Sequence, residues 1–377
     1  MSIFIFSRGY QRSGLGKRLS LILIKYLGKS SLGLGYAIAI ADLVLAPFLP
    51  SNTARSGGVL YPIVINIPTL FHSSAHHERR KIGAYMVWVC VVSMCISSSM
   101  FFTALAPHLL MISSLLDQIS ISISWNIWIN LSLYCLLPLF FISPFLIYLF
   151  YPPTSKVLPE ASQWAEEELI RMGTMSRKEL WMSAFAVLTL VVWFFSKTIG
   201  IDVVILVLGM VGLMVLCGVI SWKDVFKNAS AWNIFVWFVT LLTLSSGLHH
   251  LKITDWVGGT LEDMLIALSP HMVMVTLLVC FFVLHYFFAS LIAHVSVLLP
   301  LFVVIASKFL VAEHLQFFVV LLACSIGLMG VLTPYGTGAS PIWYSSGYIT
   351  PKEWWGLGAL FGGIFLSVLI LTIFIFV

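Results

Sequence analysis

Residues 33–72 read GLGYAIAIADLVLAPFLPSNTARSGGVLYPIVINIPTLFH, two apolar stretches separated by the polar triplet Ser51-Asn52-Thr53. Basic clusters flank this segment on both sides, at 8–29 and at 76–81. Because Lys and Arg loops stay on the cytoplasmic side of a membrane, the chain should enter and leave the segment on that one side. We therefore predict a re-entrant hairpin with its tip at the triplet. Plain spans throughout, which would place 76–81 outside, are the alternative.

The rest of the chain is similarly apolar. Of its 377 residues, 60% are hydrophobic and 9% are charged, and the mean hydropathy is +1.03. Soluble domains have about 45–50% apolar and about 25% charged residues, and disordered chains combine low hydrophobicity with high net charge. Charge-free stretches long enough for a bilayer span of about 20 residues recur along the sequence. The sequence thus predicts an all-α polytopic membrane protein.

The first predicted repeat covers residues 1–151. It begins with an amphipathic, basic stretch at 14–28 that is typical of a helix lying in the membrane interface. The cytoplasmic-side hairpin 33–72 follows, and then an apolar segment at 82–118 that the region from Ser98 to Pro107 should interrupt as a broken helix. A hydrophilic stretch at 152–179 is the predicted cytoplasmic linker.

The second predicted repeat, 180–377, has the same plan with a hairpin at 264–307, entered from the outer side, and a broken helix at 314–349. Both hairpins contain Ser-x-x-Ala followed by a basic residue, from Ser51 and from Ser290, and both broken helices contain Thr-x-x-x-Pro. The same order with opposite entry sides predicts an inverted-repeat architecture, which secondary transporters use. Fewer spans precede the first hairpin than the second, so we expect the first repeat to be truncated at its N-terminal end.

The tips and breaks should place polar groups at membrane depth. Irregular backbone is tolerated there only where protein buries it or a cavity lines it, and the N–H groups that begin a helix favour an anion. The polar groups come from Ser51 to Thr53, from Ser98 to Pro107 and from Thr333 to Pro341. Because they are rich in donors and poor in carboxylates, they favour an anionic substrate.

Arg55 and His294 occupy equivalent positions, four residues after the serine of each hairpin. A charge at the centre of a bilayer costs at least about 2.5–3.5 kcal/mol and needs a partner or a function. We interpret the two residues as fixed positive groups beside the anion site. In the alternative, Arg55 pairs with Asp42, and His294 is a neutral, hydrogen-bonded core residue. A proton relay through Asp42 is a further, weaker hypothesis.

Other function classes find little support in the sequence. A membrane enzyme needs facing acid, base or nucleophilic groups within the bilayer, and we find no such set. The six cysteines lie in apolar stretches without a CxxC pair, which predicts neither a disulfide framework nor a metal site. The basic residues form loop clusters that indicate topology rather than nucleic-acid binding. We expect no enzyme activity, no metal and no cofactor.

Motifs along the whole chain resemble the divalent anion:sodium symporter family, and most closely its dicarboxylate-exchanger branch. That branch contains bacterial citrate–succinate and tartrate–succinate exchangers and plastid 2-oxoglutarate/malate translocators. The Ser51-Asn52-Thr53 tip is the most specific of the matching motifs. The others are Gly33-Leu34-Gly35, Asp42-Leu43, Ala54 to Gly58, Tyr61-Pro62, Ser98 to Ala104, Trp232-Asn233, His285-Tyr286, Ala293-His294 and Thr333 to Gly338.

The resemblance implies an elevator-type homodimer that exchanges dicarboxylates or citrate across a bacterial inner membrane or, as the alternative, a plastid inner envelope. In exchangers, basic groups at the places of Arg55 and His294 are thought to replace sodium, which favours exchange over sodium-coupled symport. The tips and broken helices would bind the substrate carboxylates. The implied substrate-binding residues are Ser51, Asn52, Thr53, Ser98, Ser99, Thr103, Pro107, Ser290, Ile292, Thr333, Thr337, Gly338, Ser340 and Pro341.

Two departures from the family pattern leave alternatives open. The second tip has Leu291 and Ile292 where the family has a polar Asn- or Thr-type residue at one or both positions, so one carboxylate contact should be weaker or the substrate preference different. Family members also begin with further spans ahead of the stretch that opens this chain. The alternatives to exchange are therefore a sodium-coupled dicarboxylate symporter and a truncated, non-transporting remnant of a transporter.

Overall fold

The computed structural model of the chain describes residues 2–108, 125–199, 203–227 and 265–377, with isolated positions between these ranges. The end of the predicted broken helix 82–118 and the first residue of the predicted hairpin 264–307 lie outside the described residues. The described ranges are mainly helical and contain no β-strand, only an isolated bridge between Ser30 and Val157. The predicted all-α fold is confirmed.

Among the described residues, seven helices are long and apolar enough to cross a bilayer. They are Ser31–Phe48, Gly83–Met100, Trp128–Phe150, Pro270–Phe287, Leu291–Phe309, Ala312–Val331 and Pro351–Phe376. The chain is therefore a multi-pass membrane protein, as its composition predicts. The re-entrant course of the two hairpins and the inverted repeat stay predictions.

By their contacts the residues divide into two compact units. The first unit comprises 1–94, 141–235 and 342–349, and the second comprises 95–140, 236–341 and 350–377. Each unit takes segments from both predicted repeats. The boundaries of the repeats and of the linker stay predictions.

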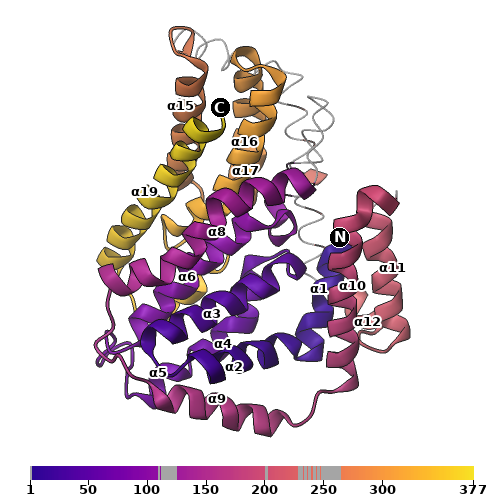
Figure 1. The fold of residues 1–377 in the computed structure, drawn as a ribbon, viewed down its shortest axis with the longest axis vertical. Helices are drawn as coiled ribbons and strands as arrows, with labels where there is room; N and C mark the ends of the chain where they lie inside the picture. The colour runs from indigo at the N-terminus through magenta and orange to yellow at the C-terminus, as the bar shows by residue number, and fades with distance from the viewer. Residues whose placement is uncertain are drawn as a thin grey trace. The chain divides into compact units, whose positions relative to one another are not determined.

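In the first unit, the helices at the start of the chain pack against one another and against α9, α10 and α11 (Figure 1). Helix α2 packs on α3 and α9, and α1 packs on α10 and α11. The left-handed backbone of Gly14, with φ of 82°, makes the sharp turn between α1 and α2. The bounds of these helices are α1 Ser2–Ser13, α2 Leu15–Leu27, α3 Ser31–Leu45, α9 Pro159–Met172, α10 Arg177–Ile199, α11 Val203–Leu216 and α12 Trp222–Phe226.

The first predicted hairpin is a series of short helical segments. Helix α3 begins at its cap Ser30, whose Oγ accepts from Gly33 N–H at 3.1 Å. The segments after α3 are short, since four prolines within 33–72 interrupt regular helix. After an irregular stretch at 49–52 the chain turns into the π-helical η2. The segments are η1 Ala46–Phe48, η2 Thr53–Leu60, α4 Tyr61–Val64 and α5 Ile67–Leu70.

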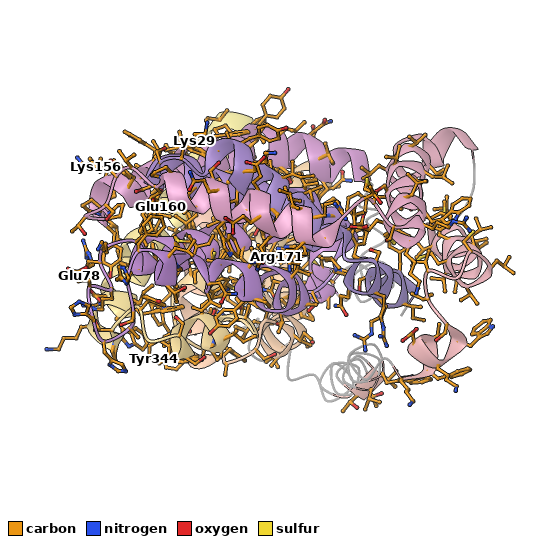
Figure 2. The ribbon with its side chains drawn as sticks, turned by 90° about the horizontal axis from the view of Figure 1, so that it is seen from below. Lys29, Glu78, Lys156, Glu160, Arg171 and Tyr344 are labelled. Carbon is orange, nitrogen blue, oxygen red and sulfur yellow. The ribbon has the colours of Figure 1, made fainter. Side chains whose placement is uncertain are left out.

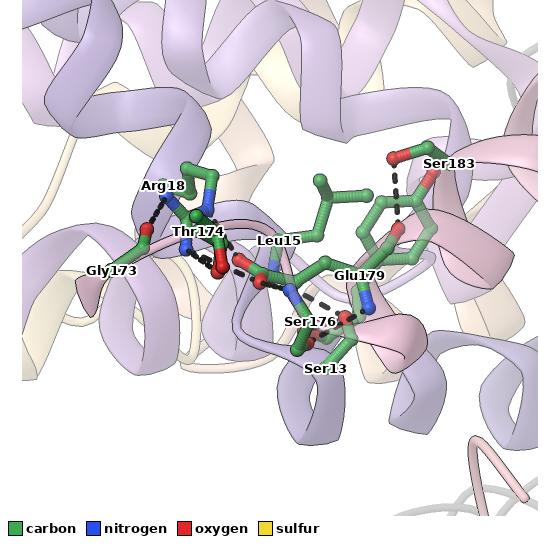
Figure 3. Close-up of polar contacts among 9 residues, drawn as sticks. Ser13, Leu15, Arg18, Gly173, Thr174, Ser176, Glu179 and Ser183 are labelled. Atoms are coloured by element: carbon green, nitrogen blue, oxygen red, sulfur yellow. Dashed lines mark hydrogen bonds and ion pairs between the residues drawn. The ribbon is translucent and has the colours of Figure 1, made fainter. Parts of the chain in front are cut away.

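A buried ion pair joins α2 to the beginning of α10 (Figure 3). Arg18 Nε donates to Glu179 Oε1 at 2.6 Å, and Arg18 Nη1 donates to Gly173 O at 2.9 Å. Glu179 also accepts from Ser176 N–H at 2.7 Å, so its carboxylate is fully engaged. The sequence predicts an interfacial helix at 14–28, and α2 fills that range, but Arg18 and the apolar residues Leu21 and Ile24 are buried against neighbouring helices.

The hydrophilic end of the first unit carries charges on several segments (Figure 2). Lys29 and Lys156 lie at its surface near the bridge between Ser30 and Val157. Helix α9 adds Glu160 and Arg171. This distribution is typical of residues that remain in water beside a membrane.

The second unit is a bundle around α17. Helix α15 packs on α16, α17 and α19, and α17 also packs on α16 and α19. Helix α16 continues through Pro300, and α17 is buried from Phe318 to Leu328. Helices α6 and α8 contribute residues to both units. The bounds are α6 Gly83–Met100, η3 Phe102–Ala104, α8 Trp125–Phe150, α15 Pro270–Val283, η4 Leu284–Phe287, α16 Leu291–Phe309, α17 Ala312–Leu328, η5 Met329–Val331, α18 Ser340–Ser345 and α19 Pro351–Phe376.

Candidate functional site

The first tip turns the chain from η1 into η2. Ser51 closes the turn, because its Oγ accepts from Ala54 N–H at 3.2 Å and its carbonyl accepts from Arg55 N–H at 2.9 Å. Asn52 is 6% exposed, and its Nδ2 has no hydrogen-bond partner among the described residues. Thr53 Oγ1 donates to Asn52 Oδ1 at 3.4 Å. The tip therefore holds one buried amide donor that no described residue satisfies.

Arg55 is fully buried in the first unit and forms the contact that the alternative interpretation expects. Its Nε donates to Asp42 Oδ1 at 3.0 Å, and Asp42 is 1% exposed. Its Nη1 donates to Leu49 O at 3.3 Å and its Nη2 to Met94 O at 3.5 Å. The pair is formally neutral, so Asp42 compensates the charge of Arg55 in this state. A role of Arg55 beside a substrate stays a prediction.

The helix after the first tip is held by the segment that follows the second break, within the same unit. Trp343 Nε1 donates to Ser56 Oγ at 2.8 Å, and the Trp343 ring meets the Tyr61 ring edge-on at 5.0 Å. A Cβ on Gly57 would lie 2.5 Å from Ile342 Cδ1, so a larger residue there would require the Ile342 side chain to move. These contacts fix the position of η2 directly after the tip.

The second tip begins α16 in the second unit. Ser290 is the cap of this helix, and its Oγ accepts from Ala293 N–H at 3.4 Å. Ser290 is exposed and Ile292 is half-buried. In the structure, as in the sequence, this tip has one hydroxyl, from the cap Ser290, and one apolar side chain, from Ile292 in the first turn of α16.

His294 lies one turn after this tip and is completely buried. Neither ring nitrogen has a hydrogen-bond partner among the described residues, so the hydrogen bond that the alternative interpretation assumes is not present there. Its ring is surrounded by Phe281 at 4.5 Å, Phe288 at 5.0 Å and His285 at 5.1 Å between centroids. A buried polar side chain without a partner is uncommon in proteins and needs an explanation.

The second break follows η5 and covers residues 332–339. Thr337 shapes it, because its Oγ1 accepts from Ala339 N–H at 3.2 Å and Ser340 N–H at 3.1 Å and lies 3.0 Å from Ser340 Oγ. Thr333 is fully buried, and its hydroxyl has no partner among the described residues. Gly338 and Pro341 are exposed. The break thus keeps one threonine for its own turn and leaves the other available.

Two hydrogen bonds join this break to the second tip. His285 Nε2 lies 2.9 Å from Gly336 O, and Tyr335 Oη donates to Tyr286 O at 3.1 Å. The second unit therefore brings the second break next to the residues that precede the second tip. We did not predict a site role for His285, although the motif His285-Tyr286 supported the family resemblance.

The first break starts later than the sequence predicts. Ser98 and Ser99 lie in the last turn of α6, whose backbone remains helical to Met100, and the irregular stretch begins at Phe101. The helical turn tolerates this serine, because Ser99 Oγ donates to Cys95 O at 3.3 Å and so has a partner within the helix. Thr103 and Pro107 are buried beyond the break.

Two glycines, Gly327 in α17 and Gly330 in η5, let these pieces approach closely within the second unit. A Cβ on Gly327 would lie 2.8 Å from Cys95 O and would contact Ser99 Oγ. A Cβ on Gly330 would collide with the Thr337 methyl group. Ser99 and Thr337 therefore lie against the same short stretch, which runs from the end of α17 into η5. The described residues contain no group of three or more His, Cys, Asp or Glu that could hold a metal ion.

A multi-pass α-helical protein whose spans are interrupted by polar, irregular segments has the architecture of a secondary transporter. The family model of the sodium:sulfate symporter transmembrane region matches residues 1–377. The chain therefore belongs to this family, the divalent anion:sodium symporters. Its members are transport proteins, so this chain is a transporter and not an enzyme.

Relatives in several bacteria are similar over almost the whole chain. They include the L-tartrate/succinate antiporters of Escherichia coli (strain K12), Shigella boydii serotype 4 (strain Sb227) and Shigella flexneri. Each is 41% identical over 371 residues, which is 98% of this chain and 76% of the relative.

Proposed function

We propose that this protein exchanges C4–C5 dicarboxylates, or citrate, across the bacterial inner membrane. Two buried donors that have no hydrogen-bond partner among the described residues carry the proposal, namely Asn52 Nδ2 in the first unit and Thr333 Oγ1 in the second. A buried polar group left unpaired costs about 1–3 kcal/mol, and a hydrogen bond to a charged group contributes about 1.5–3 kcal/mol. In each unit taken by itself, a substrate carboxylate that accepts a hydrogen bond from the unpaired donor would remove this cost and add the free energy of the new bond.

The same energetics favour exchange over one-way transport. An empty carrier would have to change conformation with its polar groups unpaired, whereas a loaded carrier has them satisfied. His294, which also lacks a partner among the described residues, adds to the cost of the empty state. Return of the carrier is then fast only when a second dicarboxylate is bound. The printed name of the bacterial relatives, L-tartrate/succinate antiporter, supports this reaction class.

We further propose that the movement is of the elevator type and that the active form is a homodimer. The polar tips and breaks would travel with the substrate, and the remaining spans would hold the partner subunit. Crosslinking between cysteines introduced in two tagged copies tests the dimer. Exclusive formation of monomers in membranes would contradict it.

Sodium-coupled symport is a second candidate that one observation favours. Because Asp42 compensates Arg55, the first tip gains no net positive charge from that residue in this state. A dianion would then need a bound cation, which sodium could supply.

A counterflow assay in proteoliposomes separates the two candidates. Vesicles loaded with unlabelled succinate are placed in labelled succinate, with and without a sodium gradient. Exchange predicts uptake that requires internal dicarboxylate and is independent of sodium. Uptake that requires the sodium gradient and is unaffected by internal dicarboxylate would instead support symport. The membrane-inserted Asn52→Ala variant is the negative control, and Asn66→Ala, at an exposed asparagine of the same unit, is its matched partner.

A further inference from the structure

The first unit contains a strongly basic cavity that takes no part in the substrate site described above. It has a volume of about 880 Å³. Residues of α1, α10 and α12 line it, together with the turn after α11. Its charged side chains, which define what we call the basic cavity, are Arg8, Arg12, Lys178, Lys223, Lys227 and Asp224. Five cations and one carboxylate give the lining a formal net charge of +4.

The single carboxylate of the basic cavity, that of Asp224, already has hydrogen-bond partners on both oxygens. Asp224 Oδ1 accepts from Arg12 Nη2 at 2.5 Å, and its Oδ2 accepts from Ser221 N–H at 3.0 Å and from Ser221 Oγ at 2.8 Å. It therefore compensates Arg12 alone, and the other cations are left for a different anion.

The remaining cations lack carboxylate partners among the described residues. Lys178, Lys223 and Lys227 are exposed and form no ion pair there. Arg8 Nη1 donates to Gln11 Oε1 at 2.7 Å, but its Nε is buried without a hydrogen-bond partner. Four like charges around one hollow repel each other, and an anion with several acceptor oxygens would remove this repulsion.

The surroundings of the basic cavity are apolar and exposed. Trp222 is 60% exposed, Phe226 is 69% exposed and Leu216, at the end of α11, is 83% exposed. Aromatic side chains next to lysines are typical of the boundary between lipid and water. A soluble anion would gain nothing from these side chains, whereas the acyl chains of a lipid would cover them.

We propose that the basic cavity binds the phosphate headgroup of an anionic phospholipid. The phosphate would lie among Lys178, Lys223 and Lys227, with Arg8 at the inner end, and the acyl chains would pass beside Trp222 and Phe226. Because the basic clusters predict that this end of the protein is cytoplasmic, the lipid would come from the inner leaflet. A bound headgroup would join α1, α10 and α12, and so stabilise the helices packed around α11.

The test measures binding of phosphatidylglycerol to the purified full-length protein in detergent micelles by native mass spectrometry. Each lysine near a membrane surface contributes about fivefold to anionic-lipid affinity. The variant Lys223→Gln/Lys227→Gln should therefore bind about 25-fold more weakly. The matched control Lys29→Gln/Lys156→Gln removes two exposed lysines of the same unit that lie outside the basic cavity (Figure 2), and its affinity should change less than twofold.

Two further ligands distinguish a lipid site from a site for soluble phosphate, and one further variant tests whether the lysines act through their charge. Phosphatidylcholine, which lacks net charge, and soluble glycerol 3-phosphate should both bind at least tenfold more weakly than phosphatidylglycerol. The charge-preserving variant Lys223→Arg/Lys227→Arg should keep wild-type affinity if the lysines act through charge. Equal phosphatidylglycerol affinity in the two Gln variants would overturn the proposal. Glycerol 3-phosphate binding as tightly as the lipid would also overturn it and would assign the cavity to a soluble phosphate.

Discussion

The guanidinium of Arg55 lies 3.0 Å from the carboxylate of Asp42, and both side chains are buried within the first unit. Neither charge can be hydrated there, so each depends on the other. Removing one partner of a buried pair leaves an uncompensated charge and costs about 3–5 kcal/mol. The pair therefore links the last part of α3 to the helix after the first tip, at the place where the tip must keep its shape.

Asp42→Asn should lower the thermal melting temperature of the detergent-solubilised protein much more than the double variant Asp42→Asn/Arg55→Met does. The single variant leaves a buried positive charge unpaired, while the double variant removes both charges. Melting followed by intrinsic fluorescence checks this. If both variants melted at the same temperature, the pair would not be the coupled element that the 3.0 Å contact indicates.

Asn52→Ala should reduce dicarboxylate exchange at least about tenfold and leave folding unchanged. Asn52 Nδ2 has no partner among the described residues, and Oδ1 accepts only a long bond of 3.4 Å from the neighbouring Thr53 Oγ1, so the main cost of removal is the hydrogen bond to a substrate, about 1.5–3 kcal/mol. Proteoliposome counterflow provides the rate, and gel filtration provides the folded fraction. In the control Asn66→Ala, exchange should stay near the wild-type rate, since Asn66 donates to Pro62 O at the surface. Normal exchange by Asn52→Ala would remove the tip from the mechanism.

The positions of the long apolar helices could be predicted from sequence because apolar length and proline punctuation are local signals. The cap at Ser290 and the end of η5 near residue 331 follow from such signals. The bond from Trp343 to Ser56 could not be predicted, because 287 residues separate its partners and no local pattern marks it. Ser98 and Ser99 were expected in the first break but belong to α6, since the Ser99 hydroxyl bonds to the helix itself and glycine in α17 accommodates it.

Replacement by phenylalanine should have different effects on protein stability at the two histidines beside the second tip. His285→Phe breaks the bond to Gly336 O and should lower stability by about 1–2 kcal/mol. His294→Phe removes two unpaired nitrogens from an aromatic pocket and should maintain or raise the melting temperature. His294→Phe should nevertheless reduce exchange, since a substrate group can no longer bond to the ring. A His294→Phe protein with full exchange activity would show that the histidine is only a packing residue.

The junction between α2 and α10 should be sensitive to acid. Burial acts to raise the pKa of Glu179, but the hydrogen bonds from Arg18 and Ser176 outweigh it, so the pKa is lowered from its ordinary value. A carboxylate with a lower pKa in the folded state stabilises the protein above the unfolded-state pKa of about 4.3, and this contribution is lost as the pH falls through the folded-state value. We expect the melting temperature to fall as the pH is lowered below about 5. Glu179→Gln should melt at a lower temperature at pH 7 and show a weaker pH dependence in this range.

Glu160→Gln, at an exposed carboxylate of α9, is the control and should leave the acid transition unchanged. An acid transition that is identical in wild type and Glu179→Gln would show that the Arg18–Glu179 pair does not stabilise this junction.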